Sequence, residues 1–185
     1  GGGCSSLTTC TTTTTGGGVT NGGNGYSAEW PIEAAKRGLP CLSTTPLALQ
    51  TFASEKNKAV FSAMGVYSPE EVEARAEVMF ENYVTTLSIE IETFIEMMNT
   101  GILPACVKDL AKYTPDMADF IGDRKKLYVS IKTETDKLAG MMAAMPHGGL
   151  EAEAFHLCDV VKPQMVKCRA IVDEVEGLLE KGFYP

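Results

Sequence analysis

Two long stretches of the chain carry apolar side chains every three or four residues, the spacing of one face of an α-helix. The first stretch follows Ser68, Pro69 and Glu71, which together form a helix start with a capping box. The second runs over about residues 150–181. The apolar positions are Val72, Ala76, Met79, Tyr83, Leu87, Ile91, Phe94 and Met98 in the first stretch, and Ala154, Leu157, Val161, Met165, Cys168, Val172, Val175 and Leu179 in the second. No stretch of useful length alternates as a β-strand would, so the pattern predicts an all-α chain.

A third long helix is predicted over residues 116–145, with Gly122 as a candidate interruption. A turn at 146–149 separates it from the last helix. Short turns between long helices favour antiparallel neighbours, so residues 67–185 are predicted to form an antiparallel bundle of about three long helices.

Proline and glycine predict irregularities within these helices. Thr100-Gly101 and Pro104 should break or kink the first, and Pro163 should kink the last, because proline removes a donor and crowds the carbonyl four residues earlier.

Residues 26–66 precede the bundle and predict short helices. Start and stop signals give helices over 28–36, 45–52 and 54–64, with Gly38 and Gly65 ending the first and third.

Residues 1–25 hold nine Gly, eight Thr and no charge. Such a low-complexity tract cannot bury enough apolar surface to offset its ordering entropy, which predicts a disordered segment. A phosphate-binding loop would need a preceding strand and a following helix, and no strand pattern is present. Since no Met comes before Met64, we expect a fragment, or first residues that are not native.

Charge and composition disfavour two classes of partner. Sixteen basic residues against 24 acidic ones give a net charge of −8, which repels a phosphate backbone and predicts no nucleic-acid binding. No apolar run reaches the roughly 20 residues of a membrane span. The six cysteines include no Cys-x-x-Cys pair, so we expect reduced thiols that behave as small apolar residues.

Few residues suggest chemistry. Glu153 and His156 form a Glu-x-x-His pair on a helix, but His147 is the one other histidine, and the second half of a di-iron site cannot be built. The acidic row Glu73, Glu77 and Glu81 predicts a solvated helix face, or alternatively a contact with a basic patch on a partner. We therefore expect no catalytic, cofactor-binding or metal-binding residue in this chain.

Several short stretches occur in an order and at a spacing that carry more information than each alone. They include Asn24-Gly25-Tyr26-Ser27, Glu29-Trp30, Glu33-Ala34-Ala35-Lys36-Arg37-Gly38-Leu39-Pro40, Thr44-Thr45-Pro46, Ser54-Glu55-Lys56-Asn57, Glu81-Asn82-Tyr83, Ile102-Leu103-Pro104-Ala105 and Cys158-Asp159-Val160-Val161. Together they resemble the C-terminal region of type III glutamine synthetases, over about residues 24–185.

The resemblance implies a parent enzyme that joins ammonia to glutamate, using ATP and Mg or Mn. It implies that the metal and phosphate ligands lie upstream of the matched region, in a catalytic domain out of which residues 26–66 lead. The expected partners are the rest of the subunit and neighbouring subunits of a homo-oligomeric ring, and the expected compartment is the cytoplasm or a plastid. A free-standing helical adaptor and a helical metalloenzyme are the alternative hypotheses.

Overall fold

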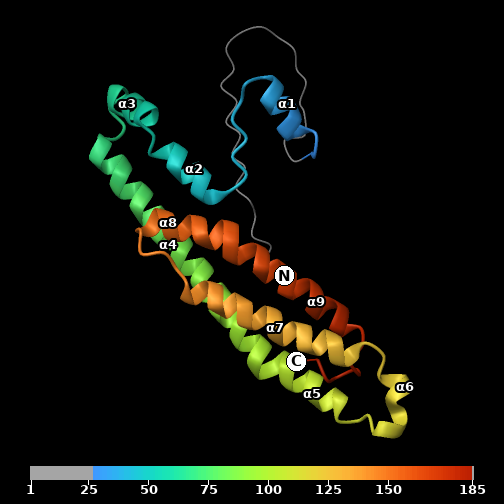
Figure 1. The fold of residues 1–185 in the computed structure, drawn as a ribbon. Coiled ribbons are helices and arrows are strands. Elements are labelled where there is room, and N and C mark those ends of the chain that lie inside the picture. The colour runs from blue at the N-terminus through green and yellow to red at the C-terminus, as the bar shows by residue number, and fades with distance from the viewer. Residues whose placement is uncertain (1–26, 185) are drawn as a thin grey trace. The chain divides into compact units, whose positions relative to one another are not determined.

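The computed structural model describes residues 27–184, in which every regular element is a helix (Figure 1). This confirms the predicted all-α class. The chain divides into two compact units, with the boundary after Ala76. The Gly/Thr-rich tract predicted to be disordered lies outside the described residues.

The first unit contains the short helices α1 (Trp30–Lys36), α2 (Thr45–Phe52) and α3 (Glu55–Ala63), and the first turns of α4 (Pro69–Met97). The three predicted short helices are thus confirmed, with ends shifted by at most two residues. Gly38 and Gly65 have φ values of +68° and +65°, the left-handed conformation expected where a helix stops. Thr44 is the N-cap residue of α2, and Pro46 occupies the second helical position.

Aromatic side chains connect α2, α3 and the start of α4. The ring centroids of Phe52 and Phe61 lie 5.6 Å apart, and those of Phe61 and Tyr67 lie 5.7 Å apart. The guanidinium carbon of Arg75 lies 4.4 Å from the Tyr67 ring centroid, in a cation–π contact. These partly exposed rings pack α3, which has no buried residue of its own.

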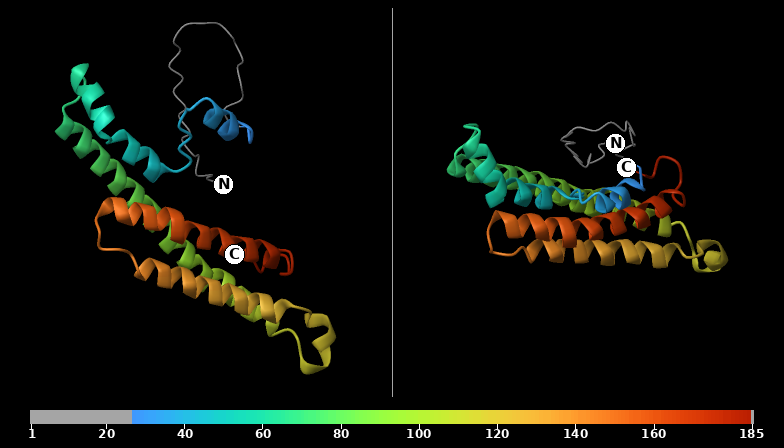
Figure 2. Two further views of the ribbon diagram at one scale, coloured as in Figure 1. Left: turned by 45° about the horizontal axis from the view of Figure 1, so that its top comes forward. Right: turned by 90° about the horizontal axis from the view of Figure 1, so that it is seen from above.

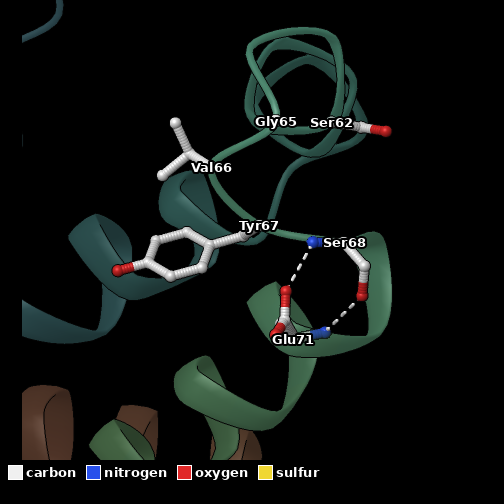
Figure 3. A pocket seen from close by; sticks show the side chains of 6 residues that line it. All are labelled: Ser62, Gly65, Val66, Tyr67, Ser68 and Glu71. Atoms are coloured by element: carbon white, nitrogen blue, oxygen red, sulfur yellow. Dashed lines mark hydrogen bonds between the residues drawn. The ribbon is translucent and has the colours of Figure 1, made fainter.

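The predicted capping box starts α4. The backbone N–H of Glu71 donates to Ser68 Oγ at 3.2 Å, and the backbone N–H of Ser68 donates to Glu71 Oε2 at 2.7 Å (Figure 3). Both donors would otherwise lack an intrahelical partner. The helix that follows, α4, is 29 residues long.

Two π turns occur where the sequence predicted a break or a kink. One is η1 (Met98–Ile102), between α4 and α5 (Leu103–Leu110); the other is η3 (Leu157–Val161), between α8 (Leu150–His156) and α9 (Lys162–Glu176). Pro104 and Pro163 each occupy the second position of the next helix. In each turn an N–H donates to the carbonyl five residues earlier, which changes the alignment of the carbonyls that the proline ring would crowd in an α-helix. The helical path therefore continues past both prolines (Figure 1).

Two predicted helix ends were wrong. The last helix ends at Glu176 rather than near residue 181. The middle helix does not start near Asp116: a 3₁₀ turn η2 (Pro115–Met117) and the short α6 (Ala118–Ile121) come first, and α7 (Arg124–Ala143) follows. Gly122, with φ +54° and ψ −140°, interrupts the helix as the sequence suggested.

In the second unit, α7 packs against both α5 and α9 and runs antiparallel to each of them (Figures 1 and 2). Their buried cluster is Met98, Ile102, Cys106, Tyr128, Ile131, Val172 and Val175. The predicted antiparallel bundle is therefore confirmed. No helix of residues 27–184 is long and apolar enough to cross a membrane.

The buried faces differ from the predicted ones at a few positions. On α4, Phe80 and Val84 are buried, whereas Met79 is 40% exposed and Tyr83 is half-buried. On α9, Gln164 is buried and Met165 is half-buried.

Candidate functional site

In the predicted Glu-x-x-His pair, the histidine has a structural role. His156 Nε2 lies 3.0 Å from the carbonyl oxygen of Met141, a contact that connects α8 to α7. Because a carbonyl only accepts, the nitrogen donates here. Among residues 27–184, no three His, Cys, Asp or Glu side chains lie close enough together to hold a metal ion.

The acidic row is divided by an ion pair. Lys58 Nζ lies 2.5 Å from Glu73 and 2.9 Å from Glu55. The Lys58 side chain is only 13% exposed, and the hydrogen bonds that it donates to Glu73, then to Glu55, raise its pKa. Glu73 therefore connects α4 to α3 within the first unit, while Glu77 and Glu81 are exposed as predicted for a solvated face.

The described cysteines are free thiols, and three of them are buried: Cys106, Cys158 and Cys168. Burial is the main cause that raises the pKa of each thiol, to about 11 for Cys106. The three thiols are therefore protonated at neutral pH and unreactive. This agrees with the predicted role as small apolar side chains; Cys4 and Cys10 lie outside the described residues.

The sequence analysis missed a buried polar cluster centred on Glu134. The Gln164 side-chain amide donates to Glu134 Oε2 at 2.8 Å and to the Glu134 carbonyl at 3.0 Å. Lys137 Nζ and Lys167 Nζ lie 2.7 Å and 2.9 Å from the same carboxylate. The hydrogen bonds from Gln164, Lys137 and Lys167 lower the pKa of Glu134 to about 2. The carboxylate is thus held ionised between α7 and α9.

A second buried cluster, also missed, surrounds Asp109. Tyr128 Oη donates to Asp109 Oδ2 at 2.8 Å, and Arg124 Nε lies 3.5 Å from the same oxygen. Burial, followed by the hydrogen bond to Asp109, raises the pKa of Tyr128. The cluster connects α5 to α7 and leaves the phenol protonated.

A spacing signal could have found the Glu134 cluster. Glu134 lies three residues after Ile131 and four before Leu138, so it occupies the apolar face of α7. Gln164 lies three residues after Val161 and four before Cys168. A polar residue at a core position must find a buried partner.

The first unit contains a shallow hollow of about 270 Å³ (Figure 3). It is lined by Ser62, Gly65, Val66, Tyr67, Ser68 and Glu71. The hydroxyl of Ser68 and the carboxylate of Glu71 already bond to backbone donors in the capping box. The hollow is therefore a consequence of the turn that starts α4.

Comparison of the chain with known proteins identifies its family. The profile described as "Glutamine synthetase C-terminal domain" matches residues 9–124, more than half of the chain. The chain belongs to this family. The predicted resemblance is confirmed.

The similar curated proteins are glutamine synthetases. The type-3 glutamine synthetase of Dictyostelium discoideum is 30% identical over 187 residues, covering 90% of this chain and 25% of that protein. The glutamine synthetase of Butyrivibrio fibrisolvens is 31% identical over 181 residues, covering 88% of this chain and 26% of that protein. The chain thus spans about a quarter of the length of the curated relatives it matches.

The matched part of this glutamine synthetase C-terminal domain ends at the start of α7. The buried cluster is completed by Tyr128, Ile131, Val172 and Val175, which lie beyond residue 124. The Asp109 cluster likewise joins a residue inside the matched segment to Tyr128 outside it. Residues 125–184 therefore supply part of the core that buries η1 and α5.

Proposed function

We propose that this chain is the helical C-terminal module of a type-3 glutamine synthetase subunit, with a structural and assembly role and no catalysis of its own. The parent enzyme would ligate ammonia to glutamate, with ATP and Mg or Mn as cofactors. The observation that carries the proposal is the match to glutamine synthetases four times as long as the matched region.

The two buried clusters support a structural role. Glu134 and Asp109 are carboxylates, the residue type that could bind metal or transfer protons, but their oxygens are taken up by Gln164, Tyr128 and neighbouring cations. Such satisfied buried contacts fix the relative positions of α5, α7 and α9. A rigid three-helix scaffold can hold surface residues in fixed positions for contact with other parts of an assembly.

The proposed partners are the rest of the subunit and neighbouring subunits of a homo-oligomeric ring. We propose a cytoplasmic location, with a plastid as the alternative. We further propose that residues 26–66 connect the catalytic part to the bundle, because the matching family profile describes a C-terminal domain.

The test is a set of three proteins assayed for γ-glutamyl hydroxamate formation with glutamate, ATP, Mg²⁺ and hydroxylamine. The isolated chain should give no turnover. The Dictyostelium relative without its matched quarter should lose assembly, measured by light scattering, and a chimera carrying residues 27–184 in place of that quarter should regain it. Turnover from the pure chain, or full assembly of the truncated relative, would refute the proposal.

A further inference from the structure

The segment between α5 and α7 exposes a large aromatic side chain. Phe120 on α6 is 73% exposed, more than any other large apolar residue among those described, and Met117 beside it is 45% exposed. Neither η2 nor α6 has a buried residue. We call residues 115–123 the α6 tip; it lies at one end of the bundle (Figure 1).

The backbone of the α6 tip is held by Arg124. Its Nη1 donates to the carbonyl oxygens of Phe120 at 3.3 Å and Ile121 at 3.4 Å. A four-residue helix is far too short to be stable alone. These bonds to the last carbonyls of α6 therefore fix the segment that presents Phe120.

Arg124 is in turn fixed by the bundle. Its Nη2 lies 3.5 Å from the carbonyl of Leu178, its Nε lies 3.5 Å from the buried Asp109 carboxylate, and its guanidinium lies 5.5 Å from the Tyr113 ring. Three parts of the second unit thus contact Arg124. Arg124 in turn fixes the α6 tip, which carries the exposed Phe120. An exposed aromatic residue on a fixed backbone loses little entropy on binding.

The α6 tip also has a charge pattern. Asp116, Asp119 and Asp123 are exposed, and residues 115–123 contain no basic side chain; Lys125 and Lys126 follow in the first turn of α7. Two copies of the tip would repel each other through these carboxylates. A partner surface that is apolar at its centre and basic along the side facing the carboxylates would fit.

We propose that the α6 tip is a docking anchor, whose Phe120 enters an apolar pocket with a basic rim on the part of the glutamine synthetase polypeptide outside this chain. The inference rests on the proposed function. The relatives are about four times as long as the matched region, so most of the polypeptide that could cover Phe120 is outside this chain. Aromatic anchors of this kind carry a large share of the binding energy in protein interfaces.

The binding experiment uses the full chain immobilised on a biosensor. The probe is the Dictyostelium type-3 glutamine synthetase without its matched quarter. Phe120→Ser should weaken binding by about tenfold or more. Val129→Ser is the matched control, since Val129 is 58% exposed on α7, and it should change binding by less than about twofold. Both variants should keep the melting temperature of the unmodified chain, because neither side chain is buried.

The charge pattern of the α6 tip is tested in the same binding experiment with charge variants. A triple variant with Asp116→Asn, Asp119→Asn and Asp123→Asn should slow association and flatten its dependence on salt, while dissociation changes little. A Lys125→Gln and Lys126→Gln variant is the charge control and should not slow association.

Two results would overturn the inference. One is no binding of the unmodified chain, or equal binding by the Phe120→Ser and Val129→Ser variants. The other is a dimer of the isolated chain, seen by light scattering, that Phe120→Ser dissociates, because Phe120 would then bind a second copy. Either result can occur while the chimera assay still supports the proposed structural role, so the two proposals fail separately.

Discussion

The leading helices of the first unit bury three residues between them, Ala34, Pro46 and Leu49, and α3 buries none. In the second unit, α7 alone buries five residues and shares a continuous core with α5 and α9. Helices of seven to nine residues gain little stability from their own backbone, so they depend on packing. The comparison indicates that the bundle stabilises itself, whereas the leading helices rely on ring contacts and ion pairs.

The largest expected effect is in the bundle core. Ile131 is 1% exposed and belongs to the buried cluster, so Ile131→Ala should lower the free energy of unfolding by about 2–5 kcal/mol. Val129→Ala, two residues earlier and exposed, should stay within about 0.5 kcal/mol. Urea melts followed by circular dichroism measure both. Equal, small losses would contradict a core centred on α7.

The Glu134 cluster should contribute next. Glu134→Gln removes a carboxylate that accepts hydrogen bonds from Gln164 and two lysines, and should cost about 1.5–3 kcal/mol at pH 7. Asp136→Asn is the control on the same helix. Its ion pair with Lys132 is exposed, and its loss should cost less than about 1 kcal/mol.

The Glu134→Gln variant also gives a pH test. The folded pKa of Glu134, about 2, lies below its ordinary value of 4.5. The stabilisation that the ionised Glu134 contributes is therefore present above about pH 4.5 and disappears as the pH falls towards 2. The gap in stability between the unmodified chain and Glu134→Gln should narrow over that interval. A gap that stays constant from pH 7 to pH 3 would show that the charge of Glu134 is not the cause.

The sequence predicted the helices of both units better than it predicted their faces. Start and stop signals are local, which is why the capping box at Ser68 and the stop at Gly65 were found. The choice between Met79 and Phe80 as the core residue depends on the neighbouring helix, because both positions allow three- or four-residue steps from Ala76. That information is absent from the spacing of a single helix.

The polar clusters were missed for a related reason. Glu134 and Gln164 are 30 residues apart, and their hydrogen bond depends on how α7 and α9 align. Charged and amide residues are usually solvated, so composition alone assigns both to the surface. The π turns were also missed, because Pro104 and Pro163 predict a disturbance but not the way in which the backbone accommodates it.

A smaller effect is expected from the two serine caps of the first unit. Ser68 Oγ accepts a bond from the Glu71 backbone N–H, whereas Ser54 caps α3 with no side-chain bond. Ser68→Ala should therefore cost about 1 kcal/mol and Ser54→Ala only a few tenths. Urea melts of the two alanine variants compare the same substitution with and without the bond. A larger loss for Ser54→Ala would reverse the interpretation.

The smallest effect is expected at the end of α3. Met64 is 72% exposed and α3 has no buried residue, so Met64→Ser should change the free energy of unfolding by no more than about 0.5 kcal/mol. Hydrogen exchange measures the local stability of α3, because amides of a helix with few buried contacts exchange without global unfolding. Amides of α3 should exchange much faster than those of α7 in both proteins. If Met64→Ser instead lowers stability by more than about 1 kcal/mol and the α3 amides are protected as well as those of α7, then α3 belongs to a cooperative core. The contrast between a self-stabilised bundle and dependent leading helices would then be wrong.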